Sequence, residues 1–388
     1  MLQIISTKCI TVAGRYNLSK SGSTFRTLAT SQMLREKHNC KVLIVGGGSG
    51  GCALAAKLSS KLGKGKVTVV DPSSKHYYQP MFTLVGGGMK DLEDSSRPME
   101  KVLPSRVKWI QSAAVEFDPN NNIVTTENGI DIKYDMLLLA TGLQLNYDKH
   151  KKRQNISISY NTALPVLFGV KHYADALWKV CEKRNINVNL RRNLIEVRAD
   201  EDIAVFQDID NPENIYEEEY AMLHVTPPMS APTALTQCKD LTNDAGFVEV
   251  DKSTLQHLKY KNVFAIGDCA STPNSKTAAS AAAQSPVVYQ NMIAALKGKE
   301  LKSVYDGYAS CPLVTGYHSC ILAEFDYNLS PLETFPFAQN KERYTMFFLK
   351  KRLMPKLYWT LMMNGYWNGP ESMRNAFKSI FKTHKKTV

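Results

Sequence analysis

Four short apolar runs, each ending in a turn, dominate the hydrophobic pattern after residue 40. They predict buried strands at 41–45, 67–71, 136–140 and 263–266. An Ala- and Leu-rich helix ending near Leu62 is expected between the first two strands, and the glycine-rich stretch 46–51 joins the first strand to it. This order predicts a βαβ unit, the building block of α/β folds.

Residues 150–245 form a second region with a different pattern. One helix is expected at 171–184, and strand-like stretches are expected at 156–160, 188–190, 194–198, 204–206 and 221–225. A long Ala-rich helix follows at about 276–297. Because a chain of 388 residues is long for a single core, we expect two domains.

The net charge of +12 is concentrated at the two ends of the chain. Residues 1–38 carry +5 and residues 341–388 carry +9, which leaves the middle slightly acidic. We therefore expect no nucleic-acid partner. The first 35 residues contain no Asp or Glu and many Ser and Thr. This composition is typical of a mitochondrial transit peptide, predicted here over 1–38, although a disordered basic leader would share it.

Gly46, Gly48 and Gly51 form a G-x-G-x-x-G pattern directly after the first strand. In a dinucleotide-binding fold the first glycine permits a tight turn, the second lets a pyrophosphate approach, and the third lets helix and strand pack closely. The helix N-terminus then offers N–H groups to the phosphates. Asp71 ends the second strand, where a ribose hydroxyl would be bound. We interpret the pattern as a dinucleotide site rather than as a plain glycine-rich turn.

Two later elements favour FAD over NAD. Residues 137–142 read Leu-Leu-Leu-Ala-Thr-Gly and residues 263–268 read Val-Phe-Ala-Ile-Gly-Asp, and both resemble elements of flavoproteins of the disulfide-reductase type. That resemblance implies that Asp268 binds the ribityl chain. The next helix begins near 276–278, so its N–H groups would stabilise negative charge on the flavin. A plain Ala-rich packing helix is the alternative for this element.

Several further segments resemble the mitochondrial sulfide:quinone oxidoreductases of eukaryotes. They are His-Tyr-Tyr-Gln-Pro at 76–80, Leu-His-Val-Thr-Pro-Pro-Met at 223–229, Ser-Cys-Pro-Leu-Val-Thr-Gly-Tyr at 310–317, Leu-Glu-Thr-Phe-Pro at 332–336 and Gly-Tyr-Trp at 365–367. The similarity extends from residue 40 to about 380 and implies an FAD-dependent enzyme with Gln79 beside the flavin. The cofactor contacts that we predict are Gly46, Gly48, Ser49, Gly50, Gly51, Asp71, Gln79, Ala114, Gly142, Asp268, Lys276, Thr277 and Ala278. We predict no metal site.

The resemblance assigns the sulfur chemistry to cysteine. In this family two cysteines face the flavin and relay sulfide sulfur as a persulfide, while electrons pass through FAD to a quinone. Cys311 matches one of them by its sequence context. The thiolate is the form of cysteine that attacks or holds sulfur. Without this context, a lone cysteine would be interpreted as a small buried hydrophobic residue.

The second family cysteine is missing from this chain. The family places it between the Thr-Gly element and the segment that this chain carries at 161–164, but here Tyr147 is followed almost at once by the basic run 150–153. Several tens of residues, including a strand, a helix and that cysteine, are therefore expected to be absent. Cys181, on an amphipathic helix, and Cys238, in a polar loop, are not convincing substitutes.

The C-terminal region, 321–388, has an amphipathic and aromatic pattern. Pro355 is expected to break one long helix into two, in which apolar residues recur mostly every four positions at Met346, Leu349, Leu353, Leu357 and Leu361. Aromatic residues suited to a lipid–water boundary are Tyr358, Trp359, Tyr366 and Trp367. After Pro370, a further segment is expected to have an apolar face made of Met373, Phe377, Ile380 and Phe381. The sequence contains no run of 18 apolar residues, so the pattern favours binding at a membrane surface. Packing on the protein's own core and a dimer interface are the alternatives.

Together these features predict an α/β fold with two Rossmann-like dinucleotide-fold domains, the second truncated, and a C-terminal amphipathic membrane-binding region. The FAD-binding domain is expected at 39–147 and 246–320, and the second domain at 148–245. The resemblance implies hydrogen sulfide, ubiquinone and a small sulfur acceptor (a thiol or sulfite) as partners, on the matrix side of the mitochondrial inner membrane. Two alternatives remain open. One is an NADH:quinone reductase of the same fold, which would need a second G-x-G-x-x-G between 142 and 267 that is not present. The other is an inactive FAD-binding relative.

Overall fold

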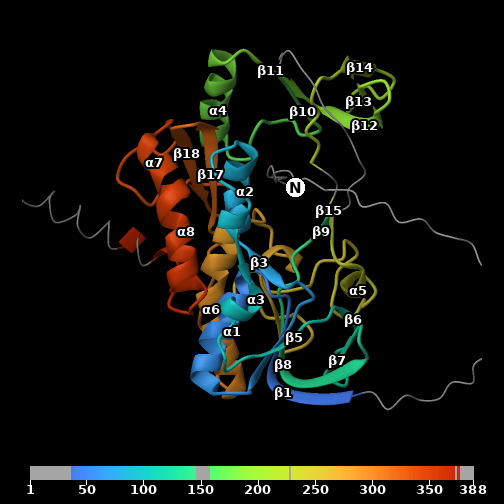
Figure 1. The fold of residues 1–388 in the computed structure, drawn as a ribbon, viewed down its shortest axis with the longest axis vertical. Helices are drawn as coiled ribbons and strands as arrows, with labels where there is room; N and C mark the ends of the chain where they lie inside the picture. The colour runs from blue at the N-terminus through green and yellow to red at the C-terminus, as the bar shows by residue number, and fades with distance from the viewer. Residues whose placement is uncertain (1–35, 146–157, 227–228, 372–373, 376–388) are drawn as a thin grey trace, which may run out of the picture.

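A seven-stranded sheet lies at the centre of the larger part of the molecule (Figure 1). The computed structural model describes residues 36–145, 158–226, 229–371 and 374–375. The strands follow the order β5–β2–β1–β8–β7–β6, and β16 also pairs with β8. Their bounds are β1 Glu36–Val45, β2 Val67–Val70, β5 Lys108–Ile110, β6 Ala114–Asp118, β7 Ile123–Thr126, β8 Ile130–Leu139 and β16 Val263–Ala265. Pairing is parallel among β5, β2, β1, β8 and β16, and antiparallel between β6, β7 and β8.

The four apolar runs form the buried part of this sheet, as predicted. Val42, Leu43 and Ile44 have no exposed surface, as expected of parallel strands that are covered on both faces. The polar start of β1 was not anticipated. Glu36 lies opposite Ile130, and the ring of His38 hydrogen-bonds Thr68 Oγ1 at 3.0 Å. Residues 36–38 therefore belong to the sheet rather than to the predicted leader, and residues 1–35 lie outside the described part of the chain.

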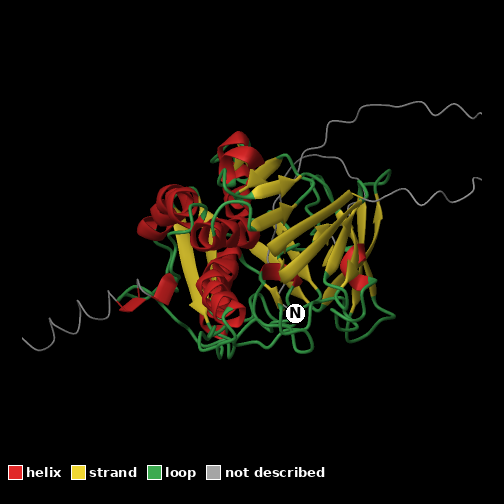
Figure 2. Cartoon of the chain, turned by 90° about the horizontal axis from the view of Figure 1, so that it is seen from below, coloured by secondary structure: helices red, strands yellow, loops and turns green. Residues whose placement is uncertain are grey.

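Helices α1 (Ser49–Leu62) and α6 (Ala278–Leu296) lie side by side and cover one face of the sheet (Figures 1 and 2). Both helices match the sequence prediction. The smaller elements of this part are β3 Lys75–Tyr77, β4 Ser96–Pro98, α2 Phe82–Gly86, α3 Met99–Val102 and α5 Thr233–Thr236. Strand β3 pairs with β4 beside the start of α1, and this pairing places His76 under the glycine-rich turn.

The second region contains one βαβ unit and a three-stranded antiparallel sheet. Strand β10 precedes α4 in the chain and β11 follows it, and the two strands pair in parallel. Strands β12, β13 and β14 come next and pair antiparallel. The bounds are β10 Ile158–Thr162, α4 Lys171–Lys183, β11 Ile186–Leu190, β12 Arg192–Arg198, β13 Ile203–Asp208 and β14 Ile215–Glu219. Two short antiparallel strands, β9 (Gln144–Leu145) and β15 (Met229–Ser230), link this region to the larger part.

The expected strand at 221–225 is wrong, because the third antiparallel strand is the acidic β14 instead. Its charged residues are tolerated because arginines of β12 neutralise them. Arg198 contacts Glu217 at 2.7 Å, and Arg192 contacts Glu218 at 2.9 Å. Arg192 also stacks 3.8 Å from the Tyr216 ring.

A hairpin and a helical segment complete the fold. Strands β17 (Ala309–Gly316) and β18 (Ser319–Phe325) pair antiparallel, and α4 packs on the face that carries Ala309, Cys311 and Ile321. The helical segment is made of α7 Tyr344–Phe348, a π-helical turn Leu349–Leu353, α8 Met354–Leu357 and a second π-helical turn Tyr358–Met362.

The expected break at Pro355 is also wrong, because helical turns continue from 344 to 362. Proline has no N–H group, so one backbone hydrogen bond of the helix is not made at Pro355. The wider π-helical turns on both sides let the helix continue in spite of this. The segment packs on the body of the protein and buries Met346, Phe347, Lys350, Tyr358, Trp359 and Met362. Leu353, part of the predicted apolar stripe, is 40% exposed. Within the described residues, every helix is too short or too polar to cross a membrane.

Candidate cofactor and sulfur site

A large cavity of about 1840 Å³ opens at the carboxyl ends of the parallel strands. The parts of the chain that line it include the glycine turn after β1, the loop between β16 and α6, strand β17, and the C-terminal helical segment. Open α/β sheets bind ligands at this edge. Most of the predicted site residues are therefore brought together, although they are far apart in the sequence.

The three glycines of the motif have different surroundings. A Cβ on Gly46, whose φ is +103°, would lie 2.3 Å from Ala140 O, and a Cβ on Gly51 would lie 1.8 Å from Gly46 O. A Cβ on Gly48 would meet no atom closer than Ala140 O at 3.9 Å. The first and third glycines therefore permit close packing, whereas the second leaves space in front of the α1 N-terminus. This is the arrangement that a pyrophosphate requires.

Asp71 shapes the same turn. Its carboxylate accepts hydrogen bonds from Gly47 N at 2.6 Å and from Ser73 N at 2.8 Å. The side chain lies on the cavity wall. The predicted ribose contact is therefore next to the turn, and it also holds the turn's backbone in place.

Asp268 and Lys276 face the cavity from the loop between β16 and α6. Burial raises the pKa of Asp268, and the nearby Lys276 opposes this shift. Burial lowers the pKa of Lys276, and its ammonium donates to Thr272 O at 3.0 Å and to Ala270 O. Thr277 caps α6 by accepting a hydrogen bond from Ser280 N at 3.0 Å, so the positive end of this 19-residue helix points to the cavity.

Unpaired polar atoms on the cavity wall test whether FAD fits. Thr272 Oγ1, Asn274 Oδ1 and Ser275 Oγ are buried and have no hydrogen-bond partner within the described parts of the chain. Buried polar atoms in native proteins nearly always have partners. A ligand rich in hydroxyl and carbonyl groups would supply them here, while the glycine turn accepts its phosphates. The residues present therefore fit FAD.

Cys311 lies on β17, lines the cavity and is 4% exposed. Burial raises the pKa of its thiol to about 12, and the Lys350 ammonium opposes this shift. Lys350 is itself buried and donates to Pro80 O at 3.0 Å. Burial lowers the pKa of Lys350, whereas Cys320 and Cys311 raise it. Lys350 thus favours the thiolate of the cysteine that the family resemblance identifies.

Lys350 was missed by the sequence reasoning. It begins the basic run Lys350, Lys351 and Arg352, which resembles a solvated helix face. Its burial depends on the packing of the C-terminal helical segment over β17 and β18, for which the local sequence gives no signal.

Not every predicted residue reaches the cavity. Gly51 packs beneath the turn, and Ala114 begins β6 away from the cavity wall. Among the cysteines in the described ranges, the one besides Cys311 that lines the cavity is Cys181 on α4. Burial raises its pKa. The position of Cys181 on the cavity wall was not anticipated.

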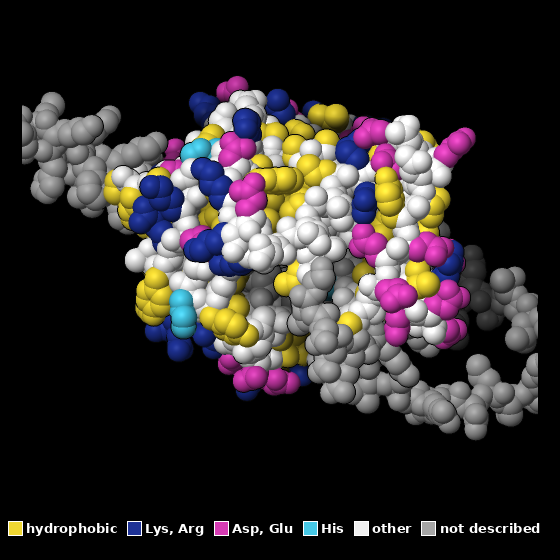
Figure 3. All heavy atoms as spheres, turned by 90° about the horizontal axis from the view of Figure 1, so that it is seen from above, with side chains coloured by type: hydrophobic (Ala, Val, Ile, Leu, Met, Phe, Trp, Pro, Cys, Tyr) yellow, Lys and Arg dark blue, Asp and Glu magenta, His cyan; other side chains and the backbone are white. Residues whose placement is uncertain are grey.

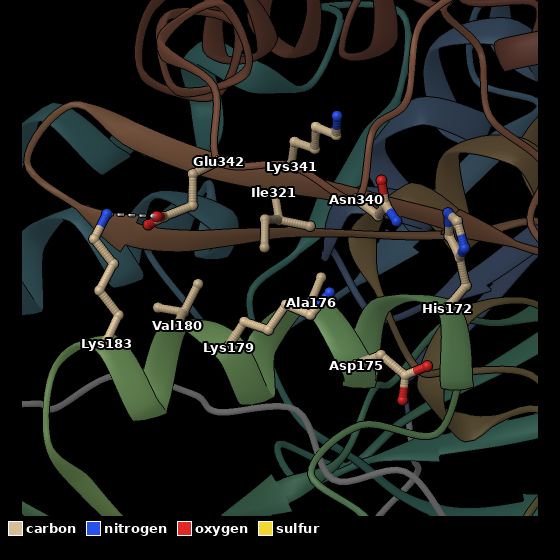
Figure 4. A pocket seen from close by; sticks show the side chains of 10 residues that line it. All are labelled: His172, Asp175, Ala176, Lys179, Val180, Lys183, Ile321, Asn340, Lys341 and Glu342. Carbon is tan, nitrogen blue, oxygen red and sulfur yellow. Dashed lines mark ion pairs between the residues drawn. The ribbon is translucent and has the colours of Figure 1, made fainter.

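A second, smaller groove of about 470 Å³ lies between α4 and β18 (Figure 4). Lys183 contacts Glu342 across it at 3.9 Å, and Val180 faces Ile321. The groove marks where α4 docks on the hairpin.

Charge is divided over this end of the molecule (Figure 3), with acidic side chains gathered beside β12–β14 and many basic ones on the side of the C-terminal helices.

The comparisons with known proteins agree with this site. Residues 40–157 match the family described as pyridine nucleotide-disulphide oxidoreductase. The mitochondrial sulfide:quinone oxidoreductase of Mus musculus is 41% identical over 415 aligned residues, which cover 90% of this chain and 92% of the relative. That of Dictyostelium discoideum is 35% identical and covers 88% and 90%. The solved sulfide:quinone oxidoreductase of Aquifex aeolicus covers 84% of this chain and 92% of its own, with a TM-score of 0.70; at 19% identity it shows the fold alone.

The fold and the glycine turn define a flavoprotein of the pyridine nucleotide-disulphide oxidoreductase class, with FAD as its cofactor. Within that class, the chain belongs to the sulfide:quinone oxidoreductase family. The alignment with the mouse relative is longer than the whole chain of 388 residues, so it contains positions that have no counterpart here. This supports the expected loss of an internal segment, although most of the expected junction lies outside the described residues.

Proposed function

We propose that this chain oxidises hydrogen sulfide at Cys311 and passes the electrons through FAD to ubiquinone. The observation that carries the proposal is the shared cavity, which Cys311 and the buried Lys350 line together with the glycine turn and the α6 N-terminus. The curated relatives named above are sulfide:quinone oxidoreductases.

The chain's residues have separate roles in this proposal. The turn around Gly48 would hold the pyrophosphate, Asp71 a ribose hydroxyl and Asp268 the ribityl chain. The α6 N-terminus would stabilise negative charge on the flavin. FAD, when bound, supplies two-electron transfer between sulfur and quinone.

The sulfur step is a balanced two-electron oxidation. The Cys311 thiolate and a hydrosulfide anion form an S–S bond and leave a persulfide anion on Cys311. The two electrons reduce the quinone, which takes one proton from the hydrosulfide and one from solvent to become a quinol. Lys350 assists because its positive charge favours both the thiolate and the persulfide anion. A small thiol or sulfite then accepts the terminal sulfur and restores Cys311.

An NADH-driven reaction is a poorer fit. A second dinucleotide would bind at the βαβ unit of the second region, but the connection from β10 to α4 contains Gly169 as its one glycine. A pyrophosphate-binding turn needs several glycines at this position.

The proposed location is the matrix side of the mitochondrial inner membrane, with residues 1–35 of the predicted leader as the import signal. The outer face of the C-terminal helical segment exposes Phe348 and Leu353, which are 52% and 40% exposed, next to Arg352 and Lys356. Apolar and basic side chains on one face suit an anionic lipid surface. The proposed domains are an FAD domain at 39–147 and 246–320, a shortened second domain at 148–245, and a C-terminal region at 321–388.

The test is a steady-state assay with sulfide, a short-tail quinone and sulfite. Wild-type protein should reduce the quinone with sulfide and not with NADH, and Cys311→Ser should abolish the reaction. Unchanged turnover in Cys311→Ser would contradict the role of this cysteine.

A second candidate follows from the lost segment, which in the family carries the partner cysteine. A chain with one flavin-side thiol could bind FAD and yet turn over poorly. In that case the wild type would retain FAD and take up sulfide sulfur on Cys311, but quinone reduction would stop after one quinone per protein molecule.

A further inference from the structure

A ring of hydrogen bonds joins the glycine turn to the C-terminal helical segment. Ser49 Oγ lies 2.8 Å from Tyr358 OH, and the same hydroxyl contacts His76 Nε2. His76 Nδ1 lies 2.8 Å from Gly47 O. The ring starts and ends in the turn that faces the expected pyrophosphate, and it closes through a residue 309 positions away from Ser49.

The direction of each hydrogen bond follows from the chemistry of the groups. Gly47 O can only accept, so His76 Nδ1 carries a proton. Burial lowers the pKa of His76 and so favours the neutral imidazole, in which Nε2 accepts from Tyr358 OH. The tyrosine oxygen then accepts from the Ser49 hydroxyl. Each group therefore donates to the next: Ser49 to Tyr358, Tyr358 to His76, and His76 to Gly47. Hydrogen bonds in such a chain polarise and strengthen one another.

Packing holds Tyr358 in this position. Its ring lies 4.4 Å from the ring of Tyr78 and stacks 5.8 Å from that of His76. Tyr358 is 5% exposed. The hydroxyl therefore has no solvent with which to replace these partners.

Independent contacts further along the chain fix the same segment to α1 and α6. Lys57 Nζ donates to Asn368 Oδ1 at 3.0 Å, and Trp367 Nε1 donates to Ala282 O at 3.0 Å. Gly365 fits so closely on α1 that a Cβ there would lie 2.9 Å from Lys57 N. The C-terminal segment is thus anchored on both helices whose N-termini face the cofactor cavity.

We propose that Tyr358 is a positioning residue of the FAD site, which holds the Gly47–Ser49 turn in the shape that receives the pyrophosphate. The C-terminal segment is then part of the cofactor site as well as a surface for other contacts. Because the Ser49 proton is committed to Tyr358, Ser49 acts mainly by holding the turn. The inference rests on the proposed cofactor site.

The experiment uses full-length protein with Tyr358→Phe, which removes the hydroxyl and keeps the ring. FAD affinity is measured by flavin fluorescence, and the two phosphorus resonances of bound FAD are recorded by ³¹P NMR. Loss of the hydroxyl leaves the buried His76 Nε2 without its donor and Ser49 Oγ without its acceptor, so the dissociation constant should rise about tenfold. The ³¹P resonances should shift, which a role confined to packing would not cause.

Two further variants sharpen the test. Tyr344→Phe changes a tyrosine of the same segment that is 61% exposed, and it should leave affinity and ³¹P resonances unchanged. Ser49→Ala should weaken FAD binding as much as Tyr358→Phe, and the double variant should be no weaker than either, because both changes open one ring. If Tyr358→Phe does not fold, Ser49→Ala with its ³¹P spectrum carries the test.

The inference is overturned if Tyr358→Phe binds FAD with wild-type affinity and unshifted ³¹P resonances, even if its apo form melts earlier. Additive effects in the double variant would overturn it as well. Failure of the cofactor site itself looks different, because the wild-type protein would then bind no FAD at all.

Discussion

Replacing Gly48 by valine should remove FAD binding and leave the fold intact. Gly48 has φ −71° and ψ −169°, a backbone conformation that any residue adopts, and a Cβ there has no neighbour within 3.9 Å. The valine side chain would instead fill the space in front of the α1 N-terminus, where the pyrophosphate must approach.

The expected magnitude follows from the hydrogen bonds that would be lost. Each N–H donor to a charged group contributes about 1.5–3 kcal/mol. Keeping the phosphate away from one or two donors should weaken FAD binding by about 3 kcal/mol, or more than 100-fold. Gly51→Ala is the matched control, in which we expect the fold to lose stability because of a clash within the turn. Its Cβ would lie 1.8 Å from Gly46 O, so the fold itself should lose about 1–3 kcal/mol or more.

Two assays separate these effects. Flavin fluorescence titration gives the FAD affinity, and urea unfolding of the apo protein gives its free energy of unfolding. Full flavin retention in folded Gly48→Val would refute the assignment of the turn. A Gly51→Ala protein as stable as the wild type would show that the packing of the turn is not as described.

Lys350→Met should raise the pKa of Cys311 and slow its alkylation at fixed pH about tenfold, and an unchanged rate would show that the lysine does not act on the thiol. Cys181→Ser should leave any remaining sulfide:quinone turnover intact; a loss as complete as in Cys311→Ser would show that Cys181 has replaced the missing thiol. Inserting the missing segment of the mouse relative after Tyr147 should increase both turnover and stability, and equal turnover would show that the two-thiol relay is dispensable here. Phe348→Ser with Leu353→Ser should reduce co-flotation with anionic vesicles without loss of flavin, and unchanged flotation would count against membrane contact through this face.

Truncation after about residue 340 is a poorer test of membrane contact than these surface substitutions. Truncation after about residue 340 would be expected from sequence to detach a membrane anchor and spare the flavin. The structure buries Tyr358, Trp359 and Met362 against the FAD-binding part. Truncation would therefore also damage the cofactor site, so surface substitutions are the better probe.

The buried parallel strands and the glycine turn were predictable because their signals are local. Val42, Leu43 and Ile44 form a continuous apolar run because both faces of the strand are covered. The turn's glycines directly follow it, and the spacing to Asp71 places the carboxylate beside Gly47. These features depend on neighbours in sequence or on one βαβ unit.

The missed features depend on contacts between distant parts of the chain. Strand β14 looks too acidic for a sheet until Arg192 and Arg198 of β12 lie beside it. Lys350 resembles a surface residue until its helix packs over β17. His76 and Tyr358 are 282 residues apart, and no periodicity or motif links them. The resemblance to a family identified Cys311, but the lysine beside it required the structure.

The most direct measurement of the central claim is anaerobic reduction of the FAD-loaded protein in a stopped-flow instrument. Addition of sulfide should bleach the visible flavin absorbance, and a short-tail quinone should restore it, whereas NADH should have no effect. Cys311→Ser, loaded with FAD to the same extent, should remain oxidised when sulfide is added. Bleaching of Cys311→Ser at the wild-type rate, or bleaching of the wild type by NADH and not by sulfide, would contradict the account.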